Sequence, residues 1–185
     1  MKKRILFAVI AVVLVVALTA CGGKTSKVEI ESSAALINSV WSTYPEEEMF
    51  PVMGGDFGNP VDGKAGVFNL TDVENAVATL HITEDAIALV DEAATLTHAM
   101  NANTFTAAAY HLTDAKNAET FVGSIKESIK STQWMCGFPD TLIIYTVGDY
   151  VVAAFGNAEA IENFKTKLAT VYGENAVLNV EEALI

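Results

Sequence analysis

The 185-residue sequence contains only two cysteines and three histidines, and its basic side chains are few. Two cysteines allow at most one disulfide, so a disulfide-rich scaffold is excluded. Eleven Lys and Arg side chains stand against 23 acidic ones, which gives a formal charge of −12. Because a phosphate backbone is bound through Lys and Arg that release its counterions, this balance argues against nucleic acid as a partner.

The motifs that carry common chemistries are also missing. A zinc site needs three or four convergent ligands, and no pair among the histidines and Cys136 has the close spacing of a metal motif. His98 and His111 could still face each other across a hairpin. The acidic stretch 46–48 lacks the D-x-[DN]-x-[DN]-G pattern of a calcium loop, no serine stands in G-x-S-x-G, and no glycine loop continues as G-K-[ST]. We therefore expect no catalytic centre, no metal site and no cofactor.

A long apolar run near the amino terminus is the first positive feature. Lys2, Lys3 and Arg4 precede sixteen apolar residues, Ile5 to Ala20. As a helix this run would span roughly 24 Å, slightly short of a bilayer core, which leaves a single-span anchor as the alternative. Small residues before a cysteine at the end of such a run instead indicate a signal peptide, residues 1–20.

Leu18-Thr19-Ala20-Cys21 resembles the bacterial lipobox. The resemblance implies that the Cys21 thiol carries a diacylglyceryl group and that a signal peptidase cleaves before it. Residues 21–31 would then form a flexible tether, and the protein would be extracytoplasmic and anchored to the bacterial cell membrane by lipid. Removing residues 1–20 leaves 8 basic against 23 acidic side chains, a formal charge of −15.

The whole sequence is 51% hydrophobic, too apolar for a disordered chain, and it is too short for two sizeable domains. Residues 32–185 should therefore fold as one domain. Residues 45–70, with three prolines and five glycines, should be mostly loop. Apolar periodicity and capping residues, including a capping box at Thr71, predict helices over residues 33–44, 71–80, a short stretch from 83, 114–131 and 157–172. Alternating and β-branched runs predict strands over residues 95–100, 104–112, 141–146 and 150–155, with turns at 101–103 and 147–149.

This order predicts an α+β fold: one antiparallel sheet from two β-hairpins, each followed by a helix covering one face (ββα-ββα), preceded by short helices. A shift of 43 residues lays Asp114–Phe121 on Asn157–Phe164 with a cap residue, Ala, Glu and Phe coinciding, which suggests an internal repeat. We accordingly expect Phe121 and Phe164 to be buried against the same face of the sheet.

The chain as a whole resembles a family of small bacterial membrane lipoproteins defined by a domain of unknown function. The residues that carry this resemblance are the lipobox, residues 80–87, Met100 to Tyr110 and the turn Gly148-Asp149-Tyr150-Val151-Val152. It covers about residues 71–172. The resemblance implies a location and a fold, and it transfers no catalytic residue.

One connector is unusually apolar. Trp134, Met135 and Phe138 lie between a predicted helix and a predicted strand, where polar residues are the rule. They could form a partner-binding surface, together with the aromatic loop around Phe50 and Phe57. Alternatively, Trp134 and Phe138 tuck under the sheet as a local plug.

These features favour a lipid-anchored extracytoplasmic binding or accessory module, for an unknown protein or small ligand, and not an enzyme. An envelope enzyme, a metal-dependent factor or a passive structural protein are the alternatives. Convergent polar side chains in a pocket would favour the enzyme, whereas an exposed apolar patch would favour the binding module.

Overall fold

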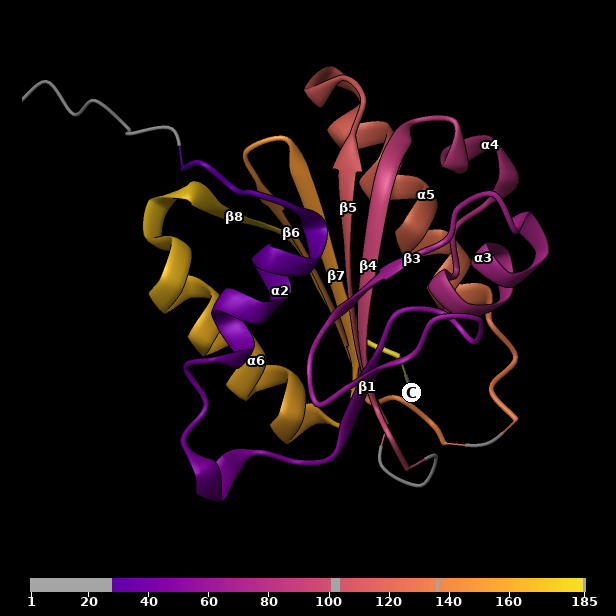
Figure 1. Ribbon diagram of the computed structural model, residues 1–185. Helices are drawn as coiled ribbons and strands as arrows, with labels where there is room; N and C mark the ends of the chain where they lie inside the picture. Colours follow the sequence, from indigo (N-terminus) through magenta and orange to yellow (C-terminus); the bar gives the residue numbers. More distant parts are fainter. Residues whose placement is uncertain (1–27, 101–103, 136, 185) are drawn as a thin grey trace, which may run out of the picture.

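The computed structural model describes residues 28–100, 104–135 and 137–184. Eight strands form one antiparallel sheet in the order β2-β1-β4-β5-β7-β6-β8, and β3 pairs with β4 (Figure 1). The strands are β1 (Val52–Gly54), β2 (Val61–Asp62), β3 (Gly66–Phe68), β4 (Val90–His98), β5 (Phe105–Leu112), β6 (Thr141–Val147), β7 (Tyr150–Gly156) and β8 (Ala176–Ala183). The helices are α2 (Ser33–Trp41), α3 (Val73–Leu80), α4 (Glu84–Ile87), α5 (Ala118–Ser131) and α6 (Ala158–Tyr172), with 3-10 turns at Glu46–Glu48, Ala115–Asn117 and Gly173–Asn175.

The predicted α+β architecture is confirmed. Hairpin β4-β5 is followed by α5, and hairpin β6-β7 by α6. The two hairpins join where β5 pairs antiparallel with β7, with Ala109 opposite Val152. Those two residues are 43 positions apart in the sequence. The shift that aligns the starts of the two helices therefore also lays β5 on β7, the strand with which β5 pairs.

The expectation that Phe121 and Phe164 share a sheet face is wrong. Along β5, Ala107 and Ala109 belong to the core that contains Phe164, whereas Tyr110 belongs to the core that contains Phe121. Helices α2 and α6 cover the first face, called here the α6 face, and α3, α4 and α5 cover the second, the α5 face (Figure 1). Because the central strands are apolar on both faces, their pattern carries no signal for which face each helix covers. The similarity between the two halves therefore includes the strands and the helix caps, whereas the two helices cover opposite faces of the sheet.

Residues 45–70 contribute three short strands where the sequence predicted mostly loop. β1 and β3 pair one after the other along the same edge of β4. They meet at Gly54 and Gly66, where a Cβ added to Gly54 would lie 2.3 Å from the Gly66 nitrogen. Strands of two or three residues have no periodicity to detect, so only their pairing with β4 defines them. β8, which pairs with β6, was likewise not predicted.

Helix caps are predicted more accurately than strand ends. The helix predicted over 157–172 is α6, which Asn157 caps and Gly173 ends with φ 52°, and the stretch predicted from 83 is α4, which Thr83 caps. The capping box at Thr71 is wrong by one residue, because the Asp72 side chain accepts the cap hydrogen bond of α3 from the Asn75 N–H. β4 begins at Val90, earlier than the predicted 95. The turn expected at 101–103 lies outside the described residues.

The sheet has two clearly different ends. At the first, the Ile30 end, the Tyr150 hydroxyl donates a hydrogen bond to the Ile30 carbonyl (3.4 Å), which places the start of the described chain beside the β6-β7 turn. At the opposite, distal end, β4 finishes at His98 and β5 starts at Phe105 (Figure 1). Among the described residues, no helix combines the length and apolarity that crossing a membrane requires.

Candidate functional site

Exposed apolar side chains gather at the distal end of the sheet. All four described methionines are exposed, from 40% for Met53 to 91% for Met135, and Phe57 and Phe138 are 87% and 61% exposed. They come from separate segments: the stretch before β1, β1 itself, the β1-β2 loop, the end of β4 and the connector after α5. We call this set the distal patch: Met49, Met53, Phe57, Met100, Met135 and Phe138.

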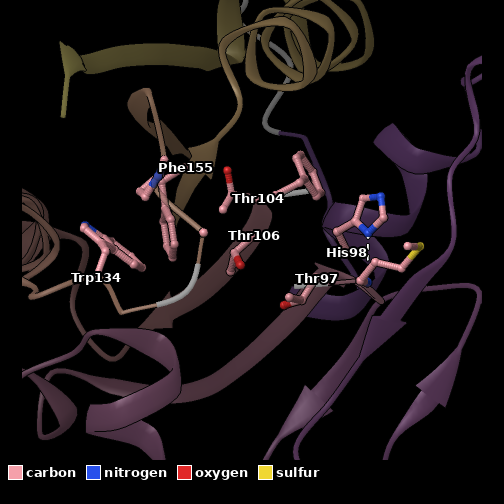
Figure 2. A pocket seen from close by; sticks show the side chains of 10 residues that line it. Thr97, His98, Thr104, Thr106, Trp134 and Phe155 are labelled. Atoms are coloured by element: carbon pink, nitrogen blue, oxygen red, sulfur yellow. Dashed lines mark hydrogen bonds between the residues drawn. The ribbon is translucent and has the colours of Figure 1, made fainter. Parts of the chain in front are cut away.

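Three hollows open at this end, and His98 borders all of them. The first has a volume of about 140 Å³ and lies between the ends of β4 and β5 and the connector after α5. Figure 2 shows it walled by the rings of Trp134 and Phe155, with Thr97, Thr104 and Thr106 along the strands. The hydroxyls of these three threonines form no hydrogen bond with any described residue.

The other two hollows flank the first. One lies between Phe50, Phe138 and the start of α6 at Asn157. The other lies between Met53, Phe57 and Thr79 of α3. Residues of the distal patch therefore border each hollow, and all three hollows adjoin the end of β4.

His98 is held at the centre of this site. Its ring stacks on Phe50, and its Nδ1 accepts a hydrogen bond from the Met100 N–H (3.0 Å). Burial lowers the pKa of His98 below its usual value. The imidazole is therefore neutral at neutral pH and brings no positive charge to the site.

The connector after α5 divides into a packed and an exposed part. Trp134 is half-buried, with its ring 5.1 Å from that of His81 and 5.4 Å from that of Phe155. Met135 and Phe138 extend into solvent instead. The plug alternative thus describes Trp134 and is wrong for Phe138.

His81 is a structural element that the sequence analysis missed. It ends α3 with φ 51°, the left-handed conformation that few residues other than glycine adopt. Its Nδ1 lies 3.0 Å from the Thr132 hydroxyl, and its ring also contacts Phe155. Burial lowers its pKa to about 4. His81 therefore joins the end of α3 to the connector and positions Trp134; no local sequence signal marks this role.

Acidic residues border the site, and no Lys or Arg lines any of the three hollows within the described chain. Glu47, Asp140 and Glu159 lie around the second hollow. Glu48 lies there too, but Lys167 neutralises it at 2.9 Å. Asp56, beside Phe57, is buried and accepts hydrogen bonds from the backbone N–H groups of Gly58, Asn59 and Asn69, which fixes the β1-β2 loop.

Groups suited to metal chemistry do not converge in the described part of the chain. No three His, Cys, Asp or Glu side chains there lie close enough to hold a metal ion. The possibility that His98 and His111 face each other is wrong, because His111 pairs with Glu92 near the start of β4, whereas His98 ends β4. There it contacts Asp91 at 2.6 Å. Cys21 and Cys136 lie outside the described residues.

A scan against protein-family models finds no match for the chain, and neither the curated proteins nor the solved structures contain a match. Function is therefore argued from the geometry of the distal end.

Proposed function

We propose that the protein is a lipid-anchored extracytoplasmic binding module that captures a polypeptide partner on its distal patch. The observation that carries this proposal is the collection of every described methionine at one end of the sheet, opposite the Ile30 end, which we call the tether end because residues 21–31 would form the tether there. A monomeric domain gains nothing by holding six large apolar side chains in water at one place.

The residue types of the patch suit binding. Methionine is unbranched and polarizable, so four of them can adapt to the shape of a partner. Phe57 and Phe138 supply aromatic anchors of the kind that dominate interface energies. Beneath them, the stack of His98 on Phe50 and the packing of Trp134 on Phe155 provide a firm base.

Attachment at Cys21 would present the patch away from the membrane. Val28 follows Cys21 by seven positions, a reach of at most about 25 Å. β5 has 8 residues and separates the two ends by roughly 27 Å. Two acyl chains would hold the tether end near the bilayer, and the formal charge of −15 would be repelled by anionic head groups.

Capture from the membranes of its own cell tests the proposal. Full-length protein is cross-linked in its own envelope and purified, alongside a Met135→Ser/Phe138→Ser variant. A Val177→Ser/Leu178→Ser variant is the matched control, because it removes two exposed apolar side chains from β8. We expect the control to retain the cross-linked partner and the patch variant to lose it. Equal capture by both variants would contradict the proposal.

A further inference from the structure

We infer that the distal patch binds a cationic, apolar polypeptide segment, one whose Lys or Arg side chains alternate with large apolar ones. This inference rests on the proposed function and names the chemistry of the partner. It follows from the charges around the patch and from the walls of the first hollow.

The second hollow is lined by four acidic side chains, and only Glu48 has an ion-pair partner among the described residues, Lys167. Glu47 and Glu159 border the second hollow, and neither forms an ion pair with a described residue. Asp140 accepts the Ala158 N–H (3.0 Å) at the start of α6 and has no cationic partner there. The patch is electrostatically complementary to a segment with positive charges, and it would repel an acidic segment.

Four of the six described lysines form ion pairs. Lys126 and Lys130 of α5 bind Glu182, and Lys165 of α6 binds Glu162 and Glu181. Lys167 binds Glu48 and lies over the Tyr44 ring. These four lysines lie along the helices and line none of the three hollows, although Glu48, the partner of Lys167, borders the second.

The first hollow has the walls that a long cationic side chain requires. The stem of a Lys or Arg can pack on Trp134 and Phe155, where aromatic rings also attract the charged head. The free hydroxyls of Thr97, Thr104 and Thr106 can accept hydrogen bonds from that head (Figure 2). The imidazole of His98, which borders this hollow and is neutral, does not repel the charged head.

Three peptides of equal length and apolar content test the inference. One alternates Lys with Phe and Leu, the second has Gln for each Lys, and the third has Glu for each Lys. Binding is measured by calorimetry to the full-length lipoprotein in nanodiscs of zwitterionic lipid, with empty nanodiscs as the blank. We expect the Lys peptide to bind about tenfold or more tightly than the Gln peptide, the Glu peptide not to bind, and added salt to reduce the difference.

Two charge variants locate the effect. Glu47→Gln/Glu159→Gln should weaken the Lys peptide about three- to tenfold and leave the Gln peptide unchanged. Glu29→Gln/Glu31→Gln removes the same charge at the tether end and should change neither. If the Lys and Gln peptides bind the patch equally, or if the two variants act alike, the inference is overturned while the proposed function stands. If no peptide binds, the inference is again overturned, and envelope capture decides the proposed function separately.

Discussion

The imidazole of His98 lies face to face with the ring of Phe50, with centroids 4.9 Å apart and planes only 7° from parallel. Phe50 also meets Trp41 and Phe105 edge-on, at 5.1 and 5.2 Å. The stretch before β1 is thereby fixed to the end of β4. Met49 precedes Phe50, and the Met100 N–H binds His98. The stack therefore also brings Met49 and Met100, two members of the distal patch, near each other.

Phe50 and Phe57 should differ sharply in their effect on stability. Phe50→Ala removes three ring contacts, so we expect unfolding free energy to fall by about 2 kcal/mol, less than for a fully buried ring. Phe57→Ala should change it by less than about 0.5 kcal/mol, because Phe57 is 87% exposed. Urea denaturation measures both. Equal losses would mean that the stack does not hold the β1 segment.

Acid should destabilise the domain through His81. Its pKa is about 4 in the folded protein and near 6.5 when unfolded, so the unfolded state binds more protons between these values. Stability should therefore fall as the pH drops from 7 to 5, by roughly 2 kcal/mol from this residue. His98, whose pKa is also lowered, adds a loss of the same sign.

His81→Asn isolates that contribution, since asparagine tolerates the left-handed backbone. The variant should be less stable than the parent at pH 7 and lose less stability between pH 7 and 5. Urea denaturation at the two pH values is the measurement. A variant with the same pH dependence as the parent would show that His81 is not buried in its neutral form.

The two phenylalanines on opposite faces should act independently. Phe121→Leu and Phe164→Leu each change the shape of a fully buried side chain, and each should cost about 1 to 2 kcal/mol. Because the sheet separates them, the double variant should lose the sum to within about 0.5 kcal/mol. A double-mutant cycle with a larger coupling energy would place them in one core.

Lipidation is tested at Cys21. Cys21→Ala removes the thiol that the alkylation step requires, so the variant should accumulate as unprocessed precursor or appear as soluble protein. Mass spectrometry of the mature protein should find a diacylglyceryl group on an amino-terminal Cys21. An unmodified Cys21 at the mature terminus would contradict the anchor.

Local signals in the sequence predict the helices and hairpins but not their placement. Asn157 and Gly173 mark α6 because a cap residue and a left-handed glycine act on their nearest neighbours. The faces of Phe121 and Phe164 depend on how α5 and α6 cross strands that are apolar on both sides. β1 and β3 have three residues each and depend on β4 for their hydrogen bonds. Their own residues are too few to show the alternation that predicts a strand.

The residues of the candidate site also differ in whether the sequence predicts them. Met135 and Phe138 are visible in the sequence because an apolar connector is unusual. Met49, Met53 and Met100 are unremarkable in their own segments, and only the pairing of β1 with β4 brings them to one end. The role of His98 follows from its stack on Phe50, which is 48 residues away along the chain.

Methionine oxidation in the native envelope tests the central claim most directly. Hydrogen peroxide converts exposed methionines to sulfoxides, and every methionine after Met1 belongs to the distal patch. Mass spectrometry would compare the oxidation rates of Met49, Met53, Met100 and Met135 in envelope membranes and in the purified protein. We expect a bound partner to slow oxidation in the membranes, and Phe138→Ser to abolish that protection. Equal rates in membranes and in purified protein would show that nothing covers the distal patch and would contradict the account.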